Sequence, residues 1–261
     1  MAPPVLSVGR AGAVGVLELA RPDKFNAITH EVFRLMAEAL DAFEAEGSGI
    51  RAVLVCAQGR HFCTGGDLAE AQSMEGDPAA LARYLEDMNR GLCRLEASLL
   101  PVVVACQGLA LAGGLELALC CDVVFAAGDA RFGDQHAQYG LVPAWGATQR
   151  LPRLVGMKRA LDLMYSGRWI DAATAEGWGV VNHVVAAEGL RQAALDYCAD
   201  LAGKSRPGLR AMKELARASE SLPLEQGLRS EQARVVAVMQ GPDPQEGIAA
   251  FLEKRAPRFS G

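Results

Sequence analysis

Short apolar runs alternate with segments of helical periodicity through the first part of the chain. Runs typical of buried strands are Val14–Leu19, Arg51–Cys56, Pro101–Cys106, Asp122–Phe125 and Val180–Val185. Between them, apolar residues recur every three or four positions after Thr29 and again after Asp77, which predicts two amphipathic helices. A small-residue helix is expected around Gly113–Cys121. Strands that alternate with helices predict βαβ crossovers and a largely parallel sheet.

Beyond about Glu188 the strand signal ends and helical patterns follow. Proline stands near the start of three such runs, at Pro207, Pro223 and Pro244, where the missing N–H of proline costs a helix nothing. We therefore predict an α/β core over residues 1–190 and a helical region over residues 191–261.

Composition narrows the class of protein. Hydrophobic residues make up 51% and charged residues 22%, which is typical of a globular protein with a substantial core. A net charge of −5 argues against nucleic acid as a partner, because such proteins concentrate Lys and Arg on one face. No apolar run approaches the ~20 residues of a membrane span, and the N-terminus lacks the pattern of a secretory signal.

The seven cysteines are scattered and form no CxxC pair. We expect reduced thiols in a cytoplasmic protein and no metal site.

Two glycine-rich turns each follow a predicted strand directly. Gly59–Leu68 comes after Arg51–Cys56, and Gly108–Glu116 comes after Pro101–Cys106. Adjacent glycines allow a ligand to approach the backbone, and the first amides of a helix have no intrahelical acceptor. At the carboxyl ends of neighbouring strands, the two turns would aim two N–H groups at one oxygen, although each alone is also typical of a tight strand-to-helix turn.

Taken together and in this order, the motifs resemble the enoyl-CoA hydratase/isomerase (crotonase) superfamily over nearly the whole chain. The segments that carry the resemblance are Arg21–Ala27, Gly59–Asp67, Ala112–Ala118 with Cys121–Asp122, Phe132–Pro143, Thr148–Arg150, Gly167–Gly179 and Phe251–Arg255. The resemblance implies an α/β fold, a crotonase-like spiral of ββα units with a helical C-terminal trimerisation region that also covers CoA. It implies a homotrimer, or a hexamer made of two trimers. The implied partner is an acyl-CoA thioester whose coenzyme A belongs to the substrate, with no separate cofactor.

The resemblance also implies an oxyanion hole formed by the main-chain N–H groups of Thr64 and Gly113. Negative charge grows on a thioester oxygen as an enolate forms, and fixed amides stabilise it. Glu116 matches one of the two catalytic glutamates of the family, with the alternative that it only favours the dipole of its helix.

The chain departs from the hydratase pattern at the second glutamate, where it has His136. Three interpretations stay open. His136 replaces the glutamate as acid and base, since imidazole titrates near ~6.5; Asp134 takes the role; or the proton chemistry at the α-carbon is absent.

The remaining site residues follow from their places in the family. CoA binding is expected at Lys24, Phe251, Lys254 and Arg255, although an exposed loop lysine and an amphipathic terminal helix would look the same. Trp145 and Tyr84 are expected at the acyl pocket, where the Trp145 indole would restrict chain length or supply an aromatic wall, with core packing as the alternative.

We therefore predict an enzyme that hydrates a 2-enoyl-CoA thioester. The alternatives are a double-bond isomerase, a thioester hydrolase or decarboxylase on the same scaffold, and an acyl-CoA-binding protein without turnover.

Overall fold

The computed structural model describes residues 4–259, and most strands join one six-stranded sheet. In spatial order the strands are β1 (Leu6–Ala11), β2 (Val14–Leu19), β3 (Ala52–Ala57), β4 (Val102–Cys106), β6 (Val123–Ala127) and β9 (His183–Val185). Only β1 and β2 pair antiparallel, and every later neighbour is parallel. The five predicted strands and the parallel sheet are confirmed, although β9 is shorter than expected, and β1 was not anticipated.

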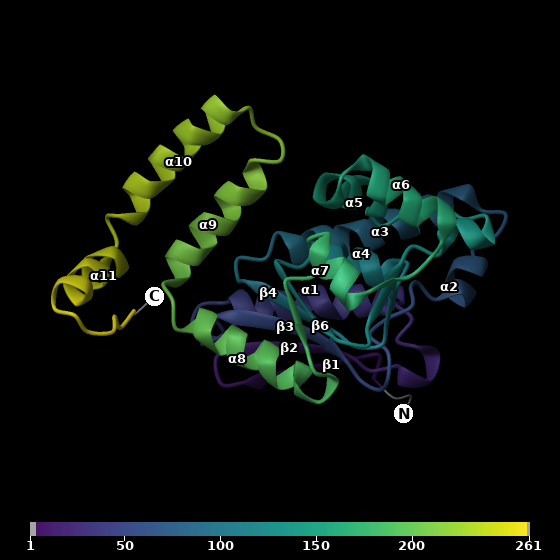
Figure 1. Cartoon of the computed structure of the whole chain (residues 1–261), viewed down its shortest axis with the longest axis horizontal. Helices are drawn as coiled ribbons and strands as arrows, with labels where there is room; N and C mark the ends of the chain where they lie inside the picture. The colour runs from purple at the N-terminus through teal and green to yellow at the C-terminus, as the bar shows by residue number, and fades with distance from the viewer. Residues whose placement is uncertain (1–3, 260–261) are drawn as a thin grey trace.

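Helices cover both faces of this sheet. On β2, Gly15 lies against Phe43 of α1 (His30–Glu44), and Glu18 accepts a hydrogen bond from Arg191 of α8 (Leu190–Ala202). Positions 15 and 18 of a strand point to opposite faces, so α1 and α8 lie on opposite sides (Figure 1). Every residue of β3 and β4 is buried, and α8 packs on both strands. Burial on both faces explains why these strands read as unbroken apolar runs.

A smaller sheet joins β5 (Leu109–Leu111), β7 (Arg131–Gly133) and β8 (Ile170–Asp171). Of the remaining core helices, α4 (Gly113–Leu119) and α7 (Ala172–Gly177) pack on this small sheet. The others are α2 (Leu68–Gln72), α3 (Pro78–Glu96), which packs on α1, and the pair α5 (Ala147–Val155) and α6 (Met157–Ser166). Short 3-10 helices stand at Pro22–Lys24, His136–Tyr139 and Ala187–Gly189. The sequence did not predict the small sheet, because strands of two or three residues show no periodicity.

The last three helices extend away from the sheets: α9 (Arg206–Ala218), α10 (Leu224–Val238) and α11 (Pro242–Leu252) (Figure 1). A helical C-terminal region is therefore confirmed. Its trimerisation role stays a prediction, as does the boundary at residue 190, next to which α8 packs on the large sheet.

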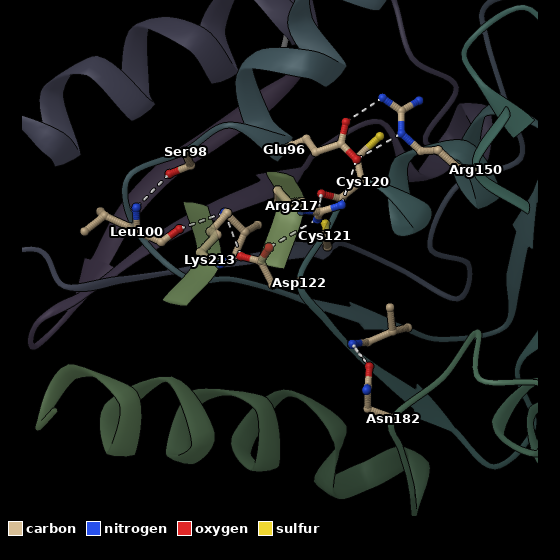
Figure 2. Close-up of polar contacts among 12 residues, drawn as sticks. Glu96, Ser98, Leu100, Cys120, Cys121, Asp122, Arg150, Asn182, Lys213 and Arg217 are labelled. Atoms are coloured by element: carbon tan, nitrogen blue, oxygen red, sulfur yellow. Dashed lines mark hydrogen bonds and ion pairs between the residues drawn. The ribbon is translucent and has the colours of Figure 1, made fainter. Parts of the chain in front are cut away.

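Ion pairs join α9 to the core. Asp122 lies between Lys213 and Arg217 of α9, and Arg217 also meets Glu96 of α3, which in turn binds Arg150 (Figure 2). Arg150 is thus held by the same network that holds the first C-terminal helix.

Candidate functional site

The two glycine-rich turns lie side by side. The N–H of Cys63 donates to the carbonyl of Leu109 at 3.0 Å, and the N–H of Leu111 donates to the carbonyl of Cys63 at 2.9 Å. A Cβ on Gly114 would lie 2.2 Å from the Cys63 carbonyl oxygen, so this close approach requires glycine. The predicted juxtaposition of the turns is therefore present.

One of the two N–H groups expected in the oxyanion hole already has an acceptor. The Thr64 N–H donates to the carbonyl of Phe25 at 3.2 Å, which does not leave it free for a substrate oxygen. Within residues 4–259, the N–H groups of Gly66 and Gly113 have no hydrogen-bond acceptor, and both residues line one cavity that Thr64 does not reach. The free N–H groups at this cavity are therefore those of Gly113 and of Gly66, which stands two residues beyond Thr64 in the same motif.

The path of the chain around Gly66 explains the difference. The flanking residues pair with Ile28, whose N–H donates to Gly65 and whose carbonyl accepts from Asp67. Gly65 has a φ of +123°, a conformation that glycine adopts without steric cost. Because Gly66 stands opposite Ile28 in this parallel bridge, the hydrogen bonds of the bridge use Gly65 and Asp67 and leave the Gly66 N–H without an acceptor.

Glu116 lies in α4 with its carboxylate buried against the segment that leads into α5. Its Oε1 accepts hydrogen bonds from the main-chain N–H groups of Trp145 and Ala147, both at 2.9 Å. Burial raises the pKa of Glu116 to about 7, against the lowering effect of these two donors and of His136. A carboxyl group that titrates near neutral pH is suited to both accept and release a proton.

His136 forms a pair with Asp134. The Oδ1 atom of Asp134 lies 2.9 Å from Nδ1 of His136 and also accepts from the His136 main-chain N–H at 3.1 Å. Burial lowers the pKa of His136, but the hydrogen bond and charge of Asp134, together with Glu116, outweigh burial and raise it overall. Asp134 is 1% exposed and does not line the cavity, whereas His136 does. The arrangement therefore places the imidazole, not Asp134, at the site.

The cavity itself has a volume of about 160 Å³. Both residues expected at the acyl pocket, Tyr84 and Trp145, line it together with Glu116 and His136. The remaining walls come mostly from apolar side chains: Leu68, Ala71, Leu81, Leu85, Leu141, Val142 and Ala144. An apolar pocket with a few convergent polar groups is the usual form of a small-molecule site.

Scaffold residues of the motifs hold the turns in place. Asp67 caps α2 by accepting from the N–H groups of Ala69 and Glu70, and it pairs with Arg21 at 2.7 Å. Arg150 donates to the Trp145 carbonyl at 3.0 Å and to Glu96 at 2.7 Å. Both side chains therefore fix the main chain around the cavity.

The structure does not bring the expected CoA-binding residues together within one chain. Lys24 is exposed at the end of its 3-10 helix, near the glycine turns. Phe251, Lys254 and Arg255 lie at the end of α11, on the opposite side of the molecule from α2 (Figure 1). Arg255 is paired there with Glu246 and Glu253.

Other site types find no support in the part of the chain that the structure describes. No three His, Cys, Asp or Glu residues there lie close enough together to hold a metal ion. The seven cysteines are all free thiols. Among the described helices, none is both long and apolar enough to cross a membrane.

Known proteins resemble this chain along nearly its whole length. A family model described as enoyl-CoA hydratase/isomerase matches residues 9–261. A "probable enoyl-CoA hydratase" of Rhizobium meliloti (strain 1021) is 35% identical over 97% of each chain. The 2,3-dehydroadipyl-CoA hydratase of Escherichia coli (strain K12) is 35% identical over 98% of each chain. The crystal structure of an enoyl-CoA hydratase from Polaromonas sp. JS666 superposes with a TM-score of 0.94 at 31% identity, covering 98% of this chain and 99% of that one. With the glycine turns, Glu116 and the apolar cavity in one place, these likenesses show that the chain is an enzyme of the enoyl-CoA hydratase/isomerase family.

Proposed function

We propose that the enzyme adds water across the double bond of a 2-enoyl-CoA thioester. The observation that carries the proposal is that one cavity joins two main-chain N–H groups without acceptors, at Gly66 and Gly113, to two acid–base side chains. These are Glu116, whose pKa burial raises to about 7, and His136, whose pKa the neighbouring Asp134 raises against the effect of burial. The names of the relatives as hydratases support the same reaction.

In the proposed reaction, the thioester oxygen binds the N–H groups of Gly66 and Gly113. The carboxylate of Glu116 takes a proton from water, and the resulting hydroxide forms a bond to the β-carbon. The electron pair of the double bond moves toward the thioester oxygen, where the two amides stabilise the enolate. Protonated His136 then gives its proton to the α-carbon, which restores the carbonyl. Proton exchange with solvent returns Glu116 and His136 to their starting forms.

Asp134 serves this scheme by orienting the imidazole. Its hydrogen bond at Nδ1 selects the tautomer that carries a proton there, so Nε2 is the ring nitrogen that exchanges protons. The Asp134 carboxylate also favours the charged imidazole that the final step requires.

The CoA-binding residues of the proposal come from two places. Lys24 lies beside the glycine turns, whereas Phe251, Lys254 and Arg255 would reach CoA from a neighbouring subunit of a trimer or hexamer. Sedimentation velocity of the purified protein measures this assembly. If the protein is a monomer, no neighbouring subunit can supply Phe251, Lys254 and Arg255, and their proposed role in CoA binding is rejected.

The test is a panel of 2-enoyl and 3-enoyl thioesters of CoA, followed for hydration, bond migration and free thiol. Glu116→Gln and His136→Ala are expected to lower the hydration rate by roughly 10²-fold or more, the usual range for a lost acid or base. His30→Ala, at an exposed position on α1, is the matched control and should retain activity.

Each other product supports a different function. Migration of a 3-enoyl double bond without hydration would identify an isomerase, and free thiol would identify a hydrolase. Thioester binding with no product would identify an acyl-CoA-binding protein. Unchanged hydration in both active-site variants would reject the assigned roles.

A further inference from the structure

The indole of Trp145 covers the two glycines of the proposed oxyanion hole. A Cβ on Gly113 would lie 2.3 Å from Cζ3 of the indole, and a Cβ on Gly66 would lie 3.0 Å from Cη2. The ring therefore packs directly against both glycines on the side to which side chains would point. Trp145 is only 5% exposed, so the indole occupies volume that would otherwise extend the cavity into the core.

Phe33 of α1 packs against the indole of Trp145. The two rings meet edge to face, with centroids 5.7 Å apart and an interplanar angle of 78°. Phe33 is itself pressed against Gly91 of α3, where an added Cβ would lie 2.6 Å from the Phe33 Cβ. Interiors are close-packed and yield little, so the indole has no free volume into which it can retreat.

Hydrogen bonds fix the backbone that carries the indole. The Trp145 N–H donates to Glu116, and its carbonyl accepts from Arg150. The neighbouring carbonyl of Ala144 accepts from the Asn89 side chain at 2.9 Å. The backbone at Trp145 is thus held from three helices, α3, α4 and α5, while Phe33 of α1 packs against the indole.

The volume that remains is small. At about 160 Å³, the cavity compares with an engineered apolar cavity of about 150 Å³ that binds benzene. It is below the ~300–1,000 Å³ that is usual for small-molecule sites, and Leu141 and Val142 line both this cavity and a neighbouring one of about 810 Å³.

We propose that Trp145, backed by Phe33 and Gly91, limits the length of the acyl group, so that the site takes short thioesters with an acyl group of about four to six carbons. The inference rests on the proposed acyl-CoA site but not on which reaction follows. Trp145 is the specificity-determining residue, and Phe33 and Gly91 act through it.

Binding of saturated thioesters tests the wall without any need for turnover. Butyryl-CoA and decanoyl-CoA are titrated calorimetrically into the wild-type protein, Trp145→Ala and Trp145→Phe. The wild type should bind decanoyl-CoA no more tightly than butyryl-CoA. In Trp145→Ala, the affinity for decanoyl-CoA should rise at least tenfold, since each newly buried methylene adds about fourfold, while the affinity for butyryl-CoA changes less than threefold. In Trp145→Phe, the ratio of the affinity for decanoyl-CoA to the affinity for butyryl-CoA should keep its wild-type value.

Two further variants guard the interpretation. Trp178→Ala removes a tryptophan that stacks with Arg159 and Arg168, away from the cavity, and should leave the ratio unchanged. If circular dichroism shows Trp145→Ala unfolded, Trp145→Leu, which keeps an apolar side chain but shortens the wall, decides in its place.

The inference is overturned if wild-type protein prefers decanoyl-CoA tenfold, which would mean that the chain leaves the cavity past α2 and α3. It is equally overturned if no folded Trp145 variant changes the ratio. A protein that discriminates by chain length but hydrates no enoyl thioester keeps the wall and loses the proposed reaction. A protein that hydrates enoyl thioesters without discriminating by chain length keeps the proposed reaction and loses the wall.

Discussion

The main-chain N–H of Trp145 donates to Oε1 of Glu116 at 2.9 Å. The residue that walls the cavity therefore also positions the proposed base. Because this bond comes from the backbone, a change of the Trp145 side chain alters the cavity without removing a donor from Glu116. Acyl-group selection and proton transfer can consequently vary independently at one residue.

The raised pKa of Glu116 predicts a pH-dependent stability. The folded protein holds a proton on Glu116 up to about pH 7, whereas the unfolded chain releases it near 4.5. The stabilising contribution is thus full below pH 4.5 and is lost as the pH rises through 7. Relative to wild type, Glu116→Gln should gain about 2–3 kcal/mol of unfolding free energy between pH 5 and pH 8. Urea unfolding at fixed protein concentration measures this difference, and an equal difference at both pH values would contradict it.

Replacement of single main-chain amides by esters separates Gly66 from Thr64. An ester at residue 66 removes a free N–H at the cavity and should lower kcat by about 10²–10³-fold. An ester at residue 64 removes the donor to the Phe25 carbonyl and should cost about 1 kcal/mol of stability with little effect on kcat. If the larger catalytic loss occurred at residue 64, the assignment drawn from the sequence would be right and Gly66 would be excluded.

Asp134→Asn tests the orientation of His136. The substitution keeps an oxygen acceptor for Nδ1 but removes the negative charge, so burial should then lower the pKa of His136. Because the proposed step uses protonated His136, the alkaline limb of kcat/KM should move to lower pH, while KM changes little. If Asp134 had only a structural role, the substitution would lower activity at every pH and would not move the alkaline limb of kcat/KM.

Arg150→Met should destabilise the fold. Arg150 is 20% exposed and bonds both Glu96 and the Trp145 carbonyl, so its loss leaves polar groups without partners at a cost of about 2 kcal/mol. Glu96 retains Arg217, which limits the loss. The control is Arg153→Met on the same helix, whose hydrogen bond to the Gln149 carbonyl is exposed. Thermal unfolding compares the two, and equal effects would remove the proposed support of Trp145 by Arg150.

The sequence alone determined the larger elements and the place of the site. Runs such as Val102–Cys106 are apolar because both faces of a central strand are buried, and that requirement is visible in the residues. The glycine turns indicated where a backbone could meet a ligand, and Glu116 and His136 were identified as the titratable groups beside it.

The tertiary structure alone decided which N–H groups are free and what closes the cavity. The Thr64 N–H is occupied by Phe25, and the Glu116 carboxylate is held by Trp145, 29 residues away. The direction of an N–H follows from backbone dihedrals and from partners distant in sequence, which a motif does not specify. The same holds for the indole wall, since Phe33 meets Trp145 and Gly91 only when α1, α3 and the segment before α5 pack together.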